Sequence, residues 1–187
     1  MMDRASFLKH LAWASAAPLV LSACGPSRSR PAPSGVASDT TVVHDLRTDV
    51  PPIDKSREEW RSVLSADEYR ILFEAGTEPR RSSPLLDETR EGTYICAACR
   101  LPLFSSETKY DSGTGWPSFW APIEDRVDTK KDMKLGYART EYHCARCDGH
   151  QGHIFNDGPE PTGLRYCNNG LALSFVPADE ALPSLRT

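Results

Sequence analysis

Thr93-Tyr94-Ile95-Cys96-Ala97-Ala98-Cys99 joins a short strand-forming run to a Cys-x-x-Cys turn, and a second such turn, Cys144-Ala145-Arg146-Cys147, follows much later in the chain. Together the two pairs supply four thiolates, which is a complete tetrahedral set for one zinc ion. A zinc held by four cysteines keeps no open coordination position. We therefore predict one structural zinc per chain, held by Cys96, Cys99, Cys144 and Cys147, that ties two distant loops together. Redox-active or disulfide-bonded pairs are the alternative, which an oxidising compartment would favour.

The segments around these turns predict a mainly β domain with antiparallel strands. Short strands are expected at residues 93–95, 135–138, 152–155 and 171–176. Gly, Pro, Asp and Asn turn signals separate these segments, and the intervals leave no room for the helices of parallel βαβ units.

Two capping boxes predict a pair of short helices ahead of the strands. Ser56 with Glu59 forms the first box, and Ser65 with Glu68 forms the second. Apolar residues at helical spacing follow each box, so we expect the two helices to pack against each other.

The first 23 residues have the features of an export signal. A basic start precedes an apolar stretch at residues 11–21, which is too short to span a bilayer comfortably. Leu21-Ser22-Ala23-Cys24 resembles the bacterial lipobox, so Cys24 is the predicted lipidation site and the mature N-terminus. Ordinary cleavage near Ala23 is the alternative. Arg4-Ala5-Ser6-Phe7-Leu8-Lys9 resembles a twin-arginine signal without its second arginine, which leaves the export route open.

The expected layout is a lipoprotein-type signal peptide at 1–23, a flexible tether at 24–53, a folded domain at 54–178 and a tail at 179–187. The tether is rich in Pro, Ser, Ala and Thr. We expect a monomer held at a bacterial membrane, on the periplasmic side or in the cell envelope, only through its lipid. The chain carries 22 Lys and Arg against 26 Asp and Glu. This acidic balance argues against nucleic acid as a partner.

Cys167 is the one cysteine of the predicted folded domain that lies outside the two pairs. In a strand, Arg165 would share its face, and the positive charge would stabilise a thiolate. His150 and His153 are close in sequence and are suited to donating a proton near neutral pH. The sequence therefore predicts a nucleophilic thiol at Cys167, with a buried and inert cysteine as the alternative.

Over residues 55–177 the chain resembles the methionine-R-sulfoxide reductases of the B type. Besides both cysteine pairs, the resemblance rests on Gly115-Trp116-Pro117-Ser118-Phe119, His150-x-Gly152-His153-x-Phe155 and Arg165-Tyr166-Cys167-x-Asn169. It implies a fold of two antiparallel sheets with the active site on the face away from the zinc. It also implies reduction of the R epimer of methionine sulfoxide through a cysteine sulfenic acid, as a repair of oxidised proteins.

The resemblance implies a role for each matched residue. Cys167 would attack the sulfoxide sulfur, and His150 and His153 would hydrogen-bond or protonate the sulfoxide oxygen. Asp157 would orient the two histidines. The implied substrate-binding residues are Trp116 and Phe155, which would form an apolar wall for the S-methyl group, together with Arg165 and Asn169.

Each of these residues also has a simpler interpretation. The histidines could be additional zinc ligands or surface residues. Trp116 could be part of the core, and Arg165 could be an ordinary surface charge. Asp157 and Asn169 both lie in sequences typical of turns.

Gly113-Thr114-Gly115 departs from the family pattern, because many members carry a resolving cysteine between these glycines. We therefore expect an external thiol, either a thioredoxin-like partner or a small thiol, to reduce the sulfenic acid directly. Gln151, Asn156 and Asn168 are smaller departures that could change the pocket. Two rival functions stay open: a non-catalytic zinc module that binds a partner, and a disulfide-handling thiol enzyme.

Overall fold

Two capped helices begin the part of the chain that this computed structural model describes, namely residues 51–134 and 136–187. Helix α1 (Arg57–Val63) begins after Ser56, and helix α2 (Ala66–Glu74) begins after Ser65. Both capping boxes are present, as predicted. The ring of Trp60 on α1 stacks on Phe73 of α2 with 5.3 Å between centroids, so the two helices pack together. The described residues include no helix long and apolar enough to cross a membrane.

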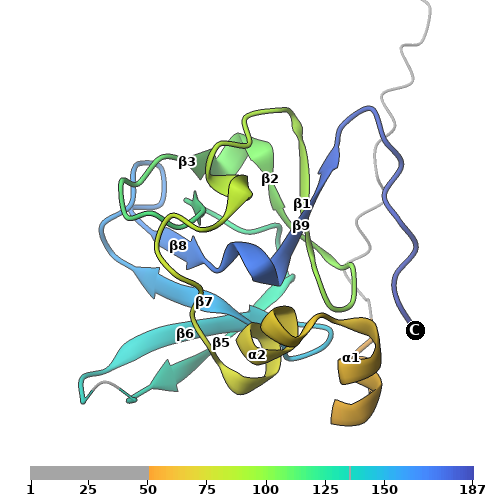
Figure 1. Cartoon of the computed structure of the whole chain (residues 1–187). Helices are drawn as coiled ribbons and strands as arrows, with labels where there is room; N and C mark the ends of the chain where they lie inside the picture. The colour runs from red at the N-terminus through yellow and green to blue at the C-terminus, as the bar shows by residue number, and fades with distance from the viewer. Residues whose placement is uncertain (1–50, 135) are drawn as a thin grey trace, which may run out of the picture. The chain divides into compact units, whose positions relative to one another are not determined.

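The described strands form two antiparallel sheets (Figure 1). The smaller sheet has the order β2-β1-β9 and contains β1 (Gly92–Cys96), β2 (Pro102–Ser105) and β9 (Leu173–Pro177). The larger sheet has the order β3-β4-β8-β7-β6-β5. Its strands are β3 (Lys109–Tyr110), β4 (Ser118–Phe119), β5 (Val127–Asp132), β6 (Arg139–Cys144), β7 (His150–Phe155) and β8 (Arg165–Asn168). The predicted mainly β fold with two antiparallel sheets is confirmed.

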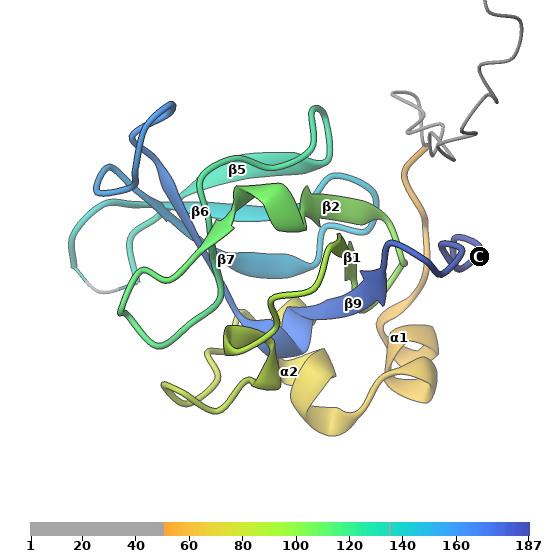
Figure 2. The same cartoon turned by 90° about the horizontal axis from the view of Figure 1, so that it is seen from above.

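Three short 3-10 helices complete the described elements: η1 (Pro84–Leu86), η2 (Ser106–Thr108) and η3 (Gly170–Ala172). Helix η3 lies between β8 and β9, and α2 packs against both η3 and β7 (Figure 2). The end of strand β8 is thereby held between a helix and the smaller sheet.

Two strand predictions need correction. Residues 136–138 form part of the hairpin loop between β5 and β6, and Gly136 has the positive φ of a turn, so no strand forms there. The predicted strand at 171–176 begins only at Leu173, because η3 occupies the residues before it. The strands predicted at 93–95 and 152–155 are confirmed within β1 and β7.

An aromatic core joins the two sheets. Tyr94 and Phe104 of the smaller sheet meet Phe119 of the larger one, and the centroids of Phe104 and Phe119 are 4.2 Å apart. All three side chains are fully buried. Since side chains alternate along a strand, Ser118, the neighbour of Phe119, faces away from this core. The candidate site lies on that outer face.

The signal peptide predicted at 1–23, the lipidation site at Cys24 and nearly all of the tether at 24–53 lie outside the described residues. The predicted tail at 179–187 packs back onto the domain. Arg186 N donates to Cys99 O at 3.1 Å, and Leu185 packs against the core.

Candidate active site and zinc centre

The four cysteines of the two Cys-x-x-Cys turns converge on one point. Their Sγ atoms all lie within 4.8 Å of one another, with 3.7 Å between Cys96 and Cys147 and 3.5 Å between Cys99 and Cys144. A tetrahedral zinc with Zn–S bonds of about 2.3 Å would place its sulfurs about 3.8 Å apart. A disulfide would require about 2 Å. All four side chains are buried, so the set fits a zinc ion better than it fits disulfides.

The two turns have the same backbone geometry. Arg100 N donates to Cys96 O at 2.8 Å, and Asp148 N donates to Cys144 O at 2.9 Å. Both donor residues have a positive φ, 65° for Arg100 and 58° for Asp148. Because β1 leads into one turn and β6 into the other, a shared zinc would join the two sheets.

Gln151 belongs to this centre rather than to the pocket. Its side-chain nitrogen donates to Cys96 Sγ at 3.6 Å, and the residue is completely buried. Gln151 is one of the departures that could have changed the pocket, but the structure directs its amide toward the cysteine cluster. Asn156, another departure, is exposed at the end of β7.

A single row of paired residues crosses the larger sheet through Cys167. From β3 to β5, the row consists of Tyr110, Ser118, Cys167, His153, Glu141 and Lys130. Directly paired residues of neighbouring strands present their side chains to the same face of the sheet. The register therefore places His153 and Ser118 on either side of Cys167.

A cavity of about 160 Å³ opens at this row. Five predicted site residues line it: Cys167, His153, Trp116, Phe155 and Asn169. Thr77 and Arg139, which the sequence did not suggest, line it too. Trp116 is half-buried, and its indole N–H donates to Glu78 O at 3.2 Å. Trp116 is therefore a cavity wall held in place from behind, rather than a fully buried core residue.

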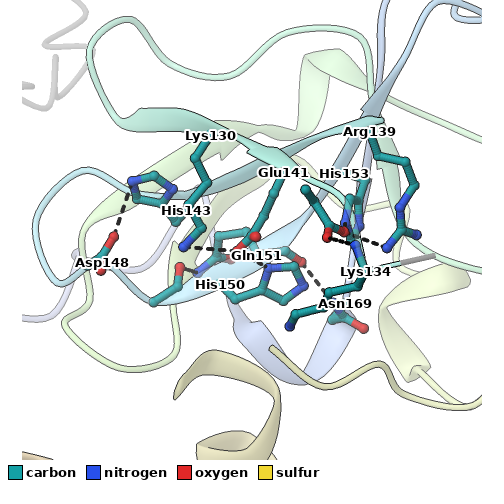
Figure 3. A network of polar contacts seen from close by, with 12 residues as sticks. Lys130, Lys134, Arg139, Glu141, His143, Asp148, His150, Gln151, His153 and Asn169 are labelled. Carbon is teal, nitrogen blue, oxygen red and sulfur yellow. Dashed lines mark hydrogen bonds and ion pairs between the residues drawn. The ribbon is translucent and has the colours of Figure 1, made fainter. Parts of the chain in front are cut away.

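Each histidine of the predicted pair is held by a carboxylate. His150 Nδ1 lies 2.8 Å from Glu141 Oε1, and His153 Nε2 lies 2.8 Å from Asp132 Oδ2. Figure 3 shows Glu141 and His150 within one chain of polar contacts that continues to Lys130. Neither histidine belongs to the cysteine cluster, so extra zinc ligation does not account for them.

Both carboxylates are held in the ionised form. Burial tends to raise the pKa of Glu141, but the hydrogen bond and charge of His150, together with Lys130, lower it overall. Hydrogen bonds from the Lys134 backbone and from His153, with the charge of Arg139, hold the pKa of Asp132 far below its usual range. An ionised carboxylate only accepts hydrogen bonds. His150 Nδ1 and His153 Nε2 therefore carry protons, and burial lowers the pKa of His150.

Asp157 does not orient the histidines, contrary to the role that the resemblance implied. Its carboxylate receives two parallel hydrogen bonds from Arg165, at 2.8 and 2.9 Å. Asp157 lies beyond the end of β7, in the turn that returns to β8, and this turn directs it to Arg165. The histidine partners are Asp132 and Glu141. Sequence reasoning missed both, because their contacts depend on strand register.

Arg165 is buried and braces the strand next to Cys167. Its guanidinium carbon lies 4.2 Å from the Phe155 ring centroid, while Asp157 neutralises much of its charge. Burial raises the pKa of the Cys167 thiol, and the charge of Arg165 with hydrogen bonds from Thr114 and Arg165 lowers it only in part. The expected stabilisation by the cation exists, but desolvation outweighs it. The thiol is therefore mostly protonated at neutral pH.

Asn169 combines a structural contact with a place in the cavity wall. Its Oδ1 accepts from Glu78 N at 3.1 Å, and its Nδ2 donates to Gln151 O at 3.0 Å. The buried carboxylate of Glu78 in turn accepts from Gly170 N and Leu171 N at the start of η3. The turn interpretation of Asn169 and its place in the site are thus compatible.

The ionised state of Glu141 leads to a prediction about acid stability. A carboxylate with a lowered folded pKa stabilises the fold above its usual pKa of 4.5 and loses that contribution as the pH falls. We expect Glu141→Gln to lower the free energy of unfolding by about 1–3 kcal/mol at pH 7. Guanidinium unfolding of both proteins at several pH values would measure the difference, which should shrink below pH 4.5. A difference that does not change with pH would contradict the ionised pairing.

Comparison with known proteins matches residues 64–177 to the family model described as the SelR domain. The peptide methionine sulfoxide reductase MsrB of Leptospira interrogans is 52% identical over 124 residues, which cover 66% of this chain and 95% of that protein. The protein of the same name from Pseudomonas putida is 53% identical over 131 residues, which cover 69% of this chain and 98% of that protein. A third protein of this name, from Caulobacter vibrioides, is 52% identical over 148 residues, which cover 79% of this chain and 91% of that protein.

Proposed function

This chain belongs to the SelR family, and from that premise we propose that it reduces the R epimer of methionine sulfoxide in peptides and proteins. The observation that carries the proposal is the cavity in which Cys167, His153, Trp116 and Phe155 meet. A methionine sulfoxide side chain has an apolar methyl group and one strongly hydrogen-bonding oxygen. The two aromatic rings suit the methyl group, and the histidine suits the oxygen.

The reaction that we propose is a transfer of oxygen from sulfoxide to thiol. The Cys167 sulfur attacks the sulfoxide sulfur, the S–O bond breaks, and the products are a thioether and a sulfenic acid on Cys167. The departing oxygen gains negative charge and needs a proton. His153 lies beside Cys167 in the register and lines the cavity, so it is the nearer of the two histidines. Because its Nε2 proton is held by Asp132, its other ring nitrogen, Nδ1, would take the thiol proton of Cys167 and pass it to this oxygen. His150 is held by Glu141, and the centroid of its ring lies 5.4 Å from that of His153.

An external thiol would complete the cycle. The described residues contain five cysteines, of which four form the zinc cluster, so none is free to resolve the sulfenic acid on Cys167. A thioredoxin-like protein or a small thiol would attack Cys167, release water and form a mixed disulfide. A second thiol would then restore Cys167. Thr114 stands at the position where many family members carry a resolving cysteine, and this replacement supports the external route.

The four-cysteine cluster would hold one zinc in a purely structural role. Four thiolates fill its coordination sphere, and none of these cysteines lines the cavity. Its contribution would be to tie the two sheets, while the chain's own thiol and imidazoles do the chemistry.

We also propose that the domain acts outside the cytoplasm as a monomer anchored through lipid on Cys24. The support is the lipobox-like Leu21-Ser22-Ala23-Cys24 and the Pro- and Ser-rich segment that follows. Metabolic labelling with a palmitate analogue, compared between wild type and Cys24→Ser, would test the anchor. Absence of label on the wild-type protein would contradict the lipid anchor but would not bear on the proposed reaction.

The reaction is tested by supplying each epimer of a peptide methionine sulfoxide separately, with dithiothreitol as the reductant. We expect turnover of the R epimer alone, because Trp116 and Phe155 would receive the methyl group from only one side. Chromatography of sulfoxide and methionine peptides would measure it. Absence of turnover with either epimer, in folded and zinc-loaded protein, would favour a non-catalytic zinc module. Equal turnover of both epimers would contradict the assigned pocket.

A further inference from the structure

Three hydroxyl groups lie in contact beside Cys167. Ser112 Oγ is 2.7 Å from Ser118 Oγ and 2.8 Å from Thr114 Oγ1. Ser118 is fully buried and pairs directly with Cys167 across β4 and β8. Ser118 Oγ also lies 3.1 Å from Trp116 O, which can accept its proton. The hydroxyls of Thr114, Ser112 and Ser118 form an unbroken series of contacts that ends at Trp116 O, a backbone carbonyl of the cavity wall.

The loop that carries Thr114 is fixed from behind. Arg80 donates to Thr114 O at 2.6 Å and to Gly113 O at 2.9 Å, and Asp111 accepts from Gly113 N at 2.8 Å. Gly115 has a φ of +89°, and a Cβ there would lie 2.4 Å from Arg80 Cγ. The close approach of Arg80 requires glycine at this position. Thr114 is therefore held against Ser112, in the hydroxyl cluster that includes Ser118, the cross-strand neighbour of Cys167.

We propose that Thr114, Ser112 and Ser118 form a hydroxyl relay that stabilises the Cys167 thiolate and reverses its direction when the thiol loses its proton. The proposal rests on the nucleophilic role proposed for Cys167. The hydrogen bond between Thr114 and Cys167 also acts to lower the pKa of the thiol. Thr114 thus has a use of its own at the position where many family members carry a resolving cysteine.

The relay works because a hydroxyl both donates and accepts. With Cys167 as a thiol, S–H donates to Thr114, Thr114 to Ser112, Ser112 to Ser118, and Ser118 to Trp116 O. With Cys167 as a thiolate, the three hydroxyls turn and Thr114 donates to the sulfur. No proton passes along the relay, and the thiol proton leaves to solvent or to the sulfoxide oxygen. The relay replaces part of the hydration that burial removes from the thiolate.

The experiment measures the rate at which iodoacetamide alkylates Cys167 in the full, zinc-loaded chain as a function of pH. Mass spectrometry of the Cys167 peptide separates this thiol from all the others. We expect Thr114→Val to raise the apparent pKa of Cys167 and to slow alkylation at neutral pH by about tenfold. Thr114→Ser keeps the donor and should restore the wild-type profile. Ser112→Ala interrupts the relay one step away and should give a smaller shift in the same direction.

Thr140→Val is the matched control, because Thr140 is exposed on β6. It makes the same Thr-to-Val substitution at a position outside the hydroxyl relay. We expect its alkylation profile to match that of the wild type. A wild-type profile in folded Thr114→Val, or a Thr114→Ser variant as slow as Thr114→Val, would overturn the relay. Alkylation needs no sulfoxide, so these outcomes are independent of the turnover assay. Wild-type protein that fails to reduce sulfoxide would count against the proposed function alone.

Discussion

Replacing Cys167 with serine is expected to reduce turnover of the R epimer by at least about a thousandfold while leaving the fold and the zinc in place. Serine has nearly the same shape, and Cys167 makes no contribution to the cysteine cluster. Its hydroxyl is hardly ionised at neutral pH and cannot accept oxygen in the form of a sulfenic acid. Initial rates with dithiothreitol, measured beside zinc content and unfolding free energy, would test this expectation.

Wild-type protein alkylated at Cys167 provides the matched control for that substitution. It keeps every residue of the chain and should be as inactive as Cys167→Ser. Substantial turnover in either protein would mean that another thiol attacks the sulfoxide. The assignment of the four paired cysteines to zinc would then also be in doubt. Loss of zinc in Cys167→Ser would instead show that the residue supports the fold.

The features that sequence reasoning predicted correctly depend on short stretches of chain. A capping box needs only four residues, and both boxes form as expected at Ser56 and Ser65. A Cys-x-x-Cys turn is equally local, so the cysteine cluster follows once the two turns meet. The division of the strands into two sheets was anticipated through the family resemblance, because no short stretch of sequence specifies which strands pair.

The features that were missed depend on strand register and on exposed faces. Strand β5 carries mostly charged, exposed side chains, so its pattern does not suggest a strand. Asp132 and Glu141 meet the histidines only because β5, β6 and β7 align in one particular register. The resemblance implied that Asp157 would orient the histidines, but its carboxylate instead pairs with Arg165 on the neighbouring strand.

Removing the zinc that we propose for the four-cysteine cluster is expected to unfold the domain rather than merely to loosen it. The two Cys-x-x-Cys turns join strands of different sheets, and the carbonyl of Cys99 receives hydrogen bonds from both Arg146 and Arg186. Without an ion, four thiols would remain buried in contact with one another, with Gln151 donating to Cys96. Binding of a structural zinc contributes roughly 10 kcal/mol or more in small zinc domains, which is comparable to the whole stability of a domain.

We therefore expect Cys144→Ser, or treatment with a strong chelator and a reductant, to abolish the cooperative unfolding transition. Near-ultraviolet circular dichroism and tryptophan fluorescence would follow the unfolding of the domain, since Trp60 and Trp116 lie in different parts of it. Activity should fall in step with the structural signal, whereas Cys167→Ser should lose activity and keep that signal. The reductant keeps the released thiols from pairing. If the chelated protein instead stays folded, and without reductant forms disulfides within the cluster, the cysteines would be redox-active pairs. The hypothesis of a disulfide-handling thiol enzyme would then replace that of a structural zinc site.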